Sequence, residues 1–369
     1  MRVLVTGADG FIGKNILLHL FEVSDIEIVC FTRDNSPTEF PSLLEGVDFI
    51  IHLAGVNRPD NSNEFMQGNA DLSEKLAQAI ISSGCKAPLV YASSIQASLD
   101  NPYGVSKRMA EDSLLALRRK HDIPVTVFRL PNVFGKWARP NYNSAVATFC
   151  HNIAHELPIQ INDPDASIDL VYIDDVVEQI ILMMREGDLE SEFSDISPIY
   201  KITVGDLANQ IYKFRNSRES MTTESVGHGL MRALHATYLS YISKDSFTYK
   251  LPSHEDDRGV FVEMLKTHDA GQFSYFTAHP GITRGGHYHH SKSEKFLVVK
   301  GTACFRFKHI ITEECHELVT TGDKPEIVET IPGWAHDITN VGSDEMIVML
   351  WANEIFSHEK PDTYASPTL

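Results

Sequence analysis

A histidine-rich stretch, RGGHYHHSKSE at residues 284–294, brings together side chains that can bind a metal or move a proton. In a strand, residues i and i+2 face the same side, so we expect His287 and His289 to face one interior and His290 to face outward. Glu294, and His336 of the later segment PGWAHDITN, can complete the set from neighbouring strands. Three imidazoles and one carboxylate suit Zn, Fe, Ni or Mn, so the sequence predicts one divalent metal, with Zn as the expected ion.

A tyrosine and a lysine share one face of an expected helix in the segment YGVSK. Tyr103 and Lys107 are four positions apart, which places them on the same side of a helix. The lysine can lower the pKa of the tyrosine electrostatically and hydrogen-bond a cofactor ribose. The tyrosine can then give a proton to a carbonyl oxygen while a hydride arrives at the carbonyl carbon. This pair therefore suits the reduction of a ketone.

Three glycines follow the first expected strand in the segment VTGADGFIG. Gly7, Gly10 and Gly13 lie between this strand and a helical pattern, where the backbone can turn tightly and approach a pyrophosphate at the helix N-terminus. The spacing predicts dinucleotide binding. After the second strand, an acid favours NAD and an arginine favours NADP. Both Asp34 and Arg33 are present, and Arg33 comes first after the apolar run, which favours NADPH.

The elements that must position Tyr103 and the glycines alternate between strands and helices. Strands rich in apolar residues are expected at residues 1–7, 26–33, 48–55, 87–94 and 123–130, and helical patterns at 11–23, 69–82, 106–121 and 143–155. This alternation implies βαβ units and a parallel sheet that is buried on both faces. We therefore expect an α/β domain over residues 1–244.

The pattern changes near residue 245. Beyond this point the chain has few helical segments and shows short strands bounded by turn residues, at 259–265, 271–281, 295–309, 324–333 and 346–356. Such spacing favours an all-β sandwich or barrel. We therefore expect a second domain over residues 245–369, which holds the histidine-rich stretch.

The composition limits the partners of the chain. Its 369 residues suit two domains, and its formal net charge of −18 argues against nucleic acid, whose phosphates would be repelled. Five cysteines, at positions 30, 85, 150, 304 and 315, are scattered and odd in number, which is typical of reduced thiols in a cytoplasmic protein. The first residues indicate a strand rather than a targeting signal, and no apolar run is long enough to span a membrane, so we expect no membrane partner.

Five segments in order, TGADGFIG, DFIIHLAG, YASS, YGVSK and YIDDVV, resemble the extended short-chain dehydrogenase/reductases that act on nucleotide-diphosphate sugars. The resemblance covers residues 1–244 and implies a Rossmann-like domain. It makes Tyr103 the acid and Lys107 its helper, with Ser94, rather than its neighbour Ser93, sharing the substrate oxygen. Only nine positions separate Ser94 from Tyr103, a shorter gap than is usual in that family, so we expect a trimmed loop and a more open substrate pocket.

The same resemblance assigns residues around the substrate and the cofactor. In LPNVFGKWARP it makes Asn132 a substrate contact. Ile168 stands where relatives commonly carry an arginine for the diphosphate, so we expect Arg139 or Lys136 to take that place. The implied cofactor contacts are Gly7, Gly10, Phe11, Ile12, Gly13, Arg33, Leu53, Ala54 and Lys107.

Two further motifs resemble the cupin fold over residues 250–360. The first spans residues 281–301, and the second matches from residue 332 onward, with its leading glycine misplaced. This resemblance implies a β-barrel whose strands carry the metal ligands. The implied ligand set is His287, His289, Glu294 and His336.

A second resemblance gives His287 a different role. The segments DDRGVFVEM and RGGHYH are similar to the deoxysugar epimerases that act on 4-keto sugars, which use a histidine as base and need no metal. By this resemblance His287 removes the proton next to the ketone, and Arg284 holds the enolate or a phosphate. A histidine whose lone pair binds a metal is a poorer base, so the two roles of His287 remain alternatives.

A reductase fused to an epimerase-like cupin resembles the bifunctional enzymes of capsular polysaccharide precursor synthesis. This implies epimerisation at C3 of a UDP-2-acetamido-2,6-dideoxy-4-ketohexose. NADPH-dependent reduction would then give UDP-2-acetamido-2,6-dideoxy-L-talose, on the route to UDP-N-acetyl-L-fucosamine. The alternatives are a reductase whose cupin only binds or dimerises, and an NADP-sensing regulator. By analogy with the fold, we expect a homodimer or a dimer of dimers.

Overall fold

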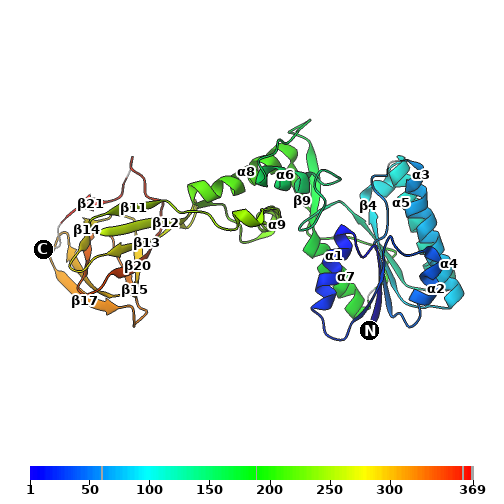
Figure 1. The fold of residues 1–369 in the computed structure, drawn as a ribbon, viewed down its shortest axis with the longest axis horizontal. Helices are drawn as coiled ribbons and strands as arrows, with labels where there is room; N and C mark the ends of the chain where they lie inside the picture. The colour runs from blue at the N-terminus through cyan, green and yellow to red at the C-terminus, as the bar shows by residue number, and fades with distance from the viewer. Residues whose placement is uncertain (60, 188, 360, 367–369) are drawn as a thin grey trace. The chain divides into compact units, whose positions relative to one another are not determined.

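The computed structural model of the protein describes residues 1–59, 61–187, 189–359 and 361–366. The chain forms two compact units, one of residues 1–212 and 232–243, the other of residues 213–231 and 244–369 (Figure 1). Residues 213–231, which the sequence places in the first domain, group with the second unit because β10 (Thr222–Thr223) pairs with β12 (Gly259–Thr267). In the described ranges, no helix combines the length and the apolar character that crossing a membrane requires.

A parallel sheet forms the centre of the first unit. Its strands follow the order β2 (Glu27–Phe31), β1 (Arg2–Thr6), β3 (Phe49–His52), β4 (Leu89–Ser94), β5 (Val125–Leu130) and β8 (Phe193–Ser194). Helices α1 (Phe11–Phe21) and α7 (Ile173–Glu186) cover one face, and α2 (Phe40–Leu43), α4 (Leu72–Ser83) and α5 (Pro102–His121) cover the other (Figure 1). An apolar cluster fills each interface, which explains the apolar strands of the sequence. The predicted Rossmann-like sheet, buried on both faces, is confirmed.

The strand order of this sheet reverses at β1. After β1 the chain forms β2 on one side, and it then returns past β1 to form β3 on the other side. In open α/β sheets, ligands bind where the order reverses in this way, outside the carboxyl ends of the strands. The glycine segment that follows β1 and residues 53–54 that follow β3 both lie at this place.

Smaller elements complete the first unit and lead to the second. A second sheet has the order β6 (Asn132–Phe134), β7 (Ser167–Tyr172) and β9 (Tyr200–Thr203). Three short helical turns and a π-helix lie near the main sheet, namely η1 (Pro37–Glu39), α3 (Asn63–Phe65), η3 (Ile95–Ser98) and the π-helix η2 (Met66–Asp71). The remaining helices are α6 (Ala145–Ala154), α8 (Val204–Ser220), α9 (Gly229–Leu239) and η4 (Lys244–Ser246).

Helix α5 begins four residues before the position expected from its apolar pattern. Asn101 caps it, because its side-chain oxygen accepts a hydrogen bond from Gly104 N at 2.8 Å. Pro102 occupies the first helical position, where its missing N–H costs nothing. Tyr103 therefore lies in the first turn of the helix, with Lys107 one turn further on.

The second unit consists of two sheets that face each other, and all their strand pairs are antiparallel except the parallel pair of β10 with β12. One has the order β10, β12, β13 (Gly271–Ala278), β20 (Met346–Ala352), β15 (Glu294–Lys300) and β18 (Ile327–Glu329), with β11 (Ser253–Asp256) paired to β12. The other has the order β17 (Cys315–Thr321), β16 (Thr302–His309), β19 (Trp334–Asn340), β14 (Thr283–Tyr288) and β21 (Tyr364–Ala365). An apolar core that includes Phe276, Phe296 and Phe305 lies between them. The all-β, cupin-like second domain predicted from the sequence is confirmed.

Candidate functional site

The glycine segment after β1 forms a tight turn at the N-terminus of α1. Gly7 has a φ of +68°, and a Cβ there would lie 2.8 Å from Ala54 N. A Cβ on Gly13 would lie 2.3 Å from the carbonyl oxygen of Gly7, so α1 packs directly against the turn. Gly10 caps α1 without a side chain, which leaves the first amides of the helix available to an anion. These features fit the pyrophosphate of a dinucleotide.

The other predicted cofactor residues surround this turn. Gly7 N donates to Phe31 O at 2.8 Å, which brings the end of β2, and Arg33 two residues later, beside the glycine segment. Arg33 and Asp34 are both exposed, and within the described residues neither side chain forms an ion pair or a hydrogen bond. The remaining expected contacts are at the start of α1, Phe11 and Ile12, and after β3, Leu53 and Ala54.

Hydrogen bonds of Thr6 fix the backbone at the end of β3 and join it to the side chain of His52. Thr6 Oγ1 accepts from the backbone N–H groups of Leu53 and Ala54, each at 3.2 Å, and lies 2.6 Å from His52 Nδ1. The other ring nitrogen of His52 lies 2.9 Å from Ser73 Oγ. Burial, together with the charge of Lys107, lowers the pKa of His52 to about 3. The network therefore holds a neutral imidazole, and it engages the backbone amides of Leu53 and Ala54.

Ser94, Tyr103 and Lys107 meet at the carboxyl end of β4. Burial raises the pKa of the Tyr103 phenol, and a side-chain hydrogen bond with Ser94 acts in the opposite direction. Lys107 is only 5% exposed, and its Nζ donates to Ala92 O at 2.9 Å. Burial lowers the pKa of Lys107 to about 7, although the nearby Glu111 carboxylate raises it. The structure thus brings together the three residues that the sequence predicts for proton transfer to a carbonyl oxygen.

The short loop between Ser94 and Tyr103 is packed tightly against α5. It forms the single turn η3, and a Cβ on Gly104 would lie 2.2 Å from Gln96 O and 2.5 Å from Leu99 O. Arg108 also binds this loop, because its Nη1 donates to Ala97 O at 2.9 Å. One compact turn therefore connects Ser94 to Tyr103.

One buried polar residue near the site has no counterpart in the sequence predictions. Asn69 lies in the π-helix η2, and its side chain binds both backbone groups of Val56, at 2.9 Å each. The same amide donates to Ser106 Oγ at 3.0 Å. A π-helix often marks a functional position, but its residues carry no periodic signal that a sequence pattern can reveal. Asn69 connects the loop after β3 to α5 beside Lys107.

The predicted substrate residues occupy β6 and the loop that follows it. Asn132 is exposed, and its side-chain amide donates to Asp169 O at 3.1 Å. Lys136 forms a 2.6 Å ion pair with Asp174, so its charge is already compensated. Arg139 is exposed, and its guanidinium lies 5.0 Å from the centre of the Tyr142 ring. Of the two cations that the sequence offers in place of an arginine at Ile168, Arg139 is the more available.

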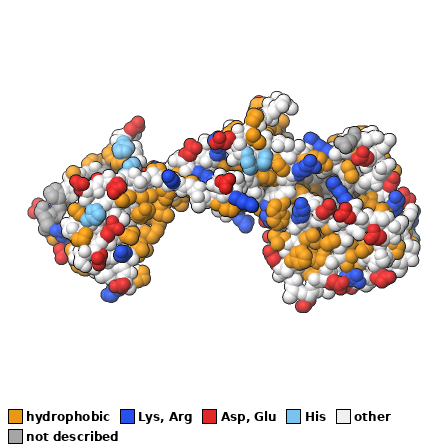
Figure 2. Space-filling view, in the orientation of Figure 1, with side chains coloured by type: hydrophobic (Ala, Val, Ile, Leu, Met, Phe, Trp, Pro, Cys, Tyr) orange, Lys and Arg blue, Asp and Glu red, His pale blue; other side chains and the backbone are white. Residues whose placement is uncertain are grey.

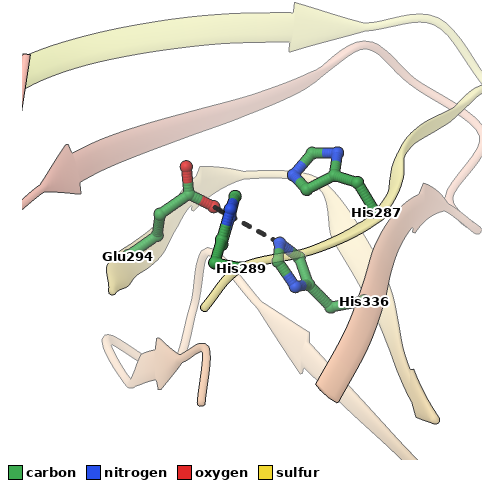
Figure 3. A group of neighbouring side chains, drawn as sticks. All are labelled: His287, His289, Glu294 and His336. Carbon is green, nitrogen blue, oxygen red and sulfur yellow. Dashed lines mark ion pairs between the residues drawn. The ribbon is translucent and has the colours of Figure 1, made fainter. Parts of the chain in front are cut away.

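In the second unit, four predicted ligands converge from three strands and a loop (Figure 3). One donor atom from each of His287, His289, Glu294 and His336 can be chosen so that all four lie within 4.8 Å of one another. His289, Glu294 and His336 are buried, and His287 is half-buried. Glu294 Oε2 lies 3.3 Å from Nε2 of His289 and 3.3 Å from Nε2 of His336.

The two buried imidazoles direct unsatisfied nitrogens at the carboxylate. Nδ1 of His289 contacts the backbone carbonyl of Asp362, which can only accept, so a neutral His289 carries its proton on Nδ1. Nε2 of His289 and Nε2 of His336 are buried, and among the described residues neither makes a hydrogen bond. Two ring nitrogens that face one carboxylate oxygen share a cation with it, which is either a proton or a metal ion. The donor set and these orphaned atoms fit a divalent metal.

A bulge in β14 brings His287 to the same site. The pairing of β14 with β19 shifts between Gly285 and His287, and both Gly285 and Gly286 have positive φ angles, of +96° and +79°. His287 then pairs with His336 across the two strands, with ring centres 4.8 Å apart. Burial and the neighbouring His336 lower the pKa of His287 to about 4. His290 is exposed and packs on Tyr364, as the alternation of side chains predicts.

Arg284 lies at the start of the same strand in a partly buried position. Its Nε donates to Thr277 O at 3.1 Å, and its guanidinium lies 5.2 Å from the centre of the Phe276 ring. Burial and the charge of Arg258 lower its pKa, and Asp256 opposes this effect. The Nη2 atom is buried, and it has no hydrogen-bond partner among the described residues. An anion is the natural partner for such a group.

Two sequence families match the chain, one in each half. The profile of the NAD dependent epimerase/dehydratase family matches residues 3–196. The profile of the polysaccharide biosynthesis C-terminal domain matches residues 254–364. The first match includes the glycine segment and the Tyr103–Lys107 pair, and the second includes the four convergent donors.

Two similar proteins match almost the whole chain or all of it, and a third matches about two thirds of it. A Pseudomonas aeruginosa protein named UDP-2-acetamido-2,6-beta-L-arabino-hexul-4-ose reductase is 60% identical, over 99% of this chain and 98% of that protein. A crystal structure of the capsular polysaccharide assembling protein CapF from Staphylococcus aureus is 40% identical and covers both chains fully, with a TM-score of 0.92. UDP-glucuronic acid 4-epimerase from Bacillus cereus, in complex with NAD, matches 67% of this chain and all of that one at 19% identity, with a TM-score of 0.58, and shares the fold.

Proposed function

We propose, since the chain belongs to the NAD dependent epimerase/dehydratase family and continues into a polysaccharide biosynthesis C-terminal domain, that it is a nucleotide-sugar ketoreductase. Its substrate would be a UDP-linked 2-acetamido-2,6-dideoxy-4-ketohexose. The observation that carries this proposal is the convergence of Ser94, Tyr103 and Lys107 beside the glycine segment. The 60% identity to a protein named as a UDP-sugar 4-ulose reductase supports the substrate class.

In the reductase half, the chain's own residues would hold the reactants and deliver a proton. NADPH, when bound, supplies the hydride. The turn at Gly7–Gly13 would hold the pyrophosphate, and Arg33 would pair with the 2′-phosphate. Lys107 would hydrogen-bond the ribose and stabilise the ionised Tyr103. The Tyr103 phenol would donate its proton to the ketone oxygen, and the Ser94 hydroxyl would hydrogen-bond the same oxygen.

In the second half, we propose epimerisation at C3, next to the ketone. His289, Glu294 and His336 would hold a divalent ion, with Zn as the expected one, and His287 would either complete the set or take the C3 proton. The ion, when bound, supplies charge that stabilises an enolate. Arg284, whose Nη2 has no partner among the described residues, would hold the enolate or a phosphate. The orphaned imidazole nitrogens support a metal, and the position of His287 at the rim of the group suits either role.

A single reaction in deuterated water tests both halves. The UDP-4-keto sugar is incubated with and without NADPH, and the products are analysed by mass spectrometry. We expect one solvent deuterium at C3 without NADPH, and reduction at C4 only with it. Tyr103→Phe should stop reduction but keep the exchange, while Tyr249→Phe, at an exposed tyrosine of the second unit, should change neither.

The outcomes separate the alternatives. Reduction without any exchange would leave the second unit as a binding or dimerisation module. Normal turnover by Tyr103→Phe would reject the reductase mechanism. NADPH binding with neither reaction would instead indicate a regulatory protein that senses the cofactor.

A further inference from the structure

A short segment, residues 361–366, lies against the loop that carries the metal ligands; we call this segment the strap. One carboxylate on the strap binds three consecutive backbone amides of that loop. Asp362 Oδ1 accepts from His290 N at 2.9 Å, and Asp362 Oδ2 accepts from Ser291 N at 2.7 Å and Lys292 N at 2.8 Å. The Ser291 hydroxyl adds a fourth hydrogen bond to Oδ2, at 2.9 Å. The strap therefore fixes the path of the loop between His289 and Glu294.

The same segment reaches two of the proposed ligands. The backbone carbonyl of Asp362 accepts from Nδ1 of His289, which directs Nε2 of that ring into the donor group. Lys292 is only 6% exposed, and its Nζ donates to Thr363 Oγ1 at 3.2 Å. This ammonium also lies 3.5 Å from Glu294 Oε1, so Oε2 is the oxygen that faces the imidazoles. One ligand is oriented directly by the strap and the other through a lysine.

Backbone pairing holds the strap in register with β14. In the backbone pairing, His287 lies opposite Ala365 and Tyr288 lies opposite Tyr364. The rings of Tyr288 and Tyr364 stack, with their centres 5.4 Å apart. Beyond the pair, Ser366 N donates to Gly286 O at 2.9 Å, next to the bulge. The third ligand-bearing position, His287, thus lies directly beside the strap. Among the described residues, His336 on β19 is the one member of the group that no hydrogen bond, ion pair or strand pairing links to the strap, directly or through Lys292.

We propose that the strap sets the geometry of the metal site, with Asp362 as the positioning residue that anchors it. The inference rests on the proposed metal site and adds a part that neither cupin-like motif contains. Partners that orient a ligand change metal affinity by roughly 10- to 100-fold when they are removed, because the ligand ring then samples unproductive orientations. Because the Asp362 carboxylate accepts four hydrogen bonds from the loop, substitution of this one side chain should be enough to change the metal affinity.

The test measures metal binding to the full chain rather than turnover. Zn²⁺ affinity is determined by competition with a chromogenic chelator, and the visible absorption of the Co²⁺-loaded protein reports ligand geometry. We expect Asp362→Ala to weaken Zn²⁺ binding by roughly 10- to 100-fold and to change the Co²⁺ spectrum. Asp362→Asn, which keeps one acceptor, should recover part of both. Glu359→Ala removes a nearby exposed carboxylate and should leave both unchanged.

The results distinguish this inference from the metal site itself. If the wild-type chain binds no metal, the proposed site fails, and the strap has nothing to position. If the wild type binds metal and folded Asp362→Ala binds it equally well with the same spectrum, the strap inference is wrong. Should Asp362→Ala not fold, Asp362→Asn decides, since it removes the carboxylate charge and one acceptor oxygen but keeps the size of the side chain. Wild-type affinity and spectrum in that variant would also overturn the inference.

Discussion

Ser93 donates a 2.5 Å hydrogen bond to a carboxylate oxygen of Glu111, and both side chains are buried. The second oxygen of Glu111 accepts from Arg129 Nη2 at 2.6 Å, so this carboxylate is fully engaged. Ser93 is thereby committed to the interior, whereas Ser94, one residue later, is half-buried at the end of β4. Two adjacent serines that look alike in the sequence thus have different surroundings.

Substitution of Ser94 should affect catalysis, and substitution of Ser93 should affect stability. Ser94→Ala should lower kcat for ketone reduction by roughly 10²- to 10³-fold, because a hydrogen bond to the substrate oxygen is lost. Ser93→Ala should keep kcat but lower the free energy of unfolding by about 1–3 kcal/mol, since Glu111 loses a buried donor. Steady-state kinetics and denaturant unfolding of both variants measure the split. The reverse pattern would make Ser93 the substrate contact.

Arg33 should determine the preference for NADPH. A charged hydrogen bond to the 2′-phosphate is worth about 1.5–3 kcal/mol, which corresponds to a rise in KM for NADPH of roughly 10- to 100-fold in Arg33→Ala. The KM for NADH should hardly change, because NADH lacks that phosphate. Arg185→Ala, which removes an exposed charge at the end of α7, controls for the general loss of positive charge. An equal effect on both cofactors would assign the recognition elsewhere, with Asp34 as the next candidate.

Arg139 should contribute to binding of the sugar nucleotide. Its guanidinium is exposed, so we expect Arg139→Ala to raise the KM for the UDP-sugar about tenfold, as expected for the loss of about 1.4 kcal/mol. Lys136→Ala should instead lower thermal stability, because Asp174 loses its 2.6 Å partner. Kinetics with saturating NADPH and thermal unfolding distinguish the two. Should Lys136→Ala alone raise the KM, the assignment of the two cations is reversed.

Neighbouring histidines should differ in their effect on the metal. His289→Ala should lose bound metal and solvent exchange at C3, because a buried ligand is removed. His290→Ala should keep both, since this ring lies outside the donor group against Tyr364. Metal content by mass spectrometry and deuterium incorporation provide the readout. Full exchange in metal-free protein would leave His287 as a base that acts without a metal.

Acid should weaken the first unit through His52. Its pKa is about 3 in the folded protein, against 6.5 for the ordinary side chain, because burial disfavours the charged ring. Below pH 6.5 the His52 ring is protonated in the unfolded chain but stays neutral in the folded protein. The free energy of unfolding is therefore unaffected by His52 above pH 6.5 and decreases as the pH falls from 6.5 towards 3. The expected slope is about 1.4 kcal/mol per pH unit. His52→Gln should flatten the curve of unfolding free energy between pH 6 and pH 4, and equal slopes would contradict this.

The features that could be predicted from the sequence are those that depend on residues close together in the chain. Alternating strands and helices, the glycine spacing and the i, i+4 pair of Tyr103 and Lys107 are each contained within a few turns of chain. His287 and His289 could be grouped by strand parity, which is also local, and the resemblance to the cupin motifs supplied Glu294 and His336. That they actually converge depends on the bulge at Gly285–Gly286, which no composition rule places.

The residues that the sequence did not predict act over long separations. Asp362 binds a loop that lies about 70 positions earlier in the chain, and its role depends on the pairing of β21 with β14. Asn69 acts from a π-helix, whose widened turn has no repeating pattern. Contacts of this kind are set by how sheets and helices pack, and a carboxylate or an amide in a polar stretch gives no sign of them.

The turn between Ser94 and Tyr103 also limits how this enzyme can be redesigned. A side chain at position 104 would collide with two carbonyl oxygens of the turn, so helix and turn fit each other only as a matched pair. Grafting a longer loop from a relative would therefore require replacing the start of α5 in the same step. Engineers who wish to change the sugar preference of this scaffold have more freedom in the segment after β6, where the side chains of Trp137 and Arg139 are exposed.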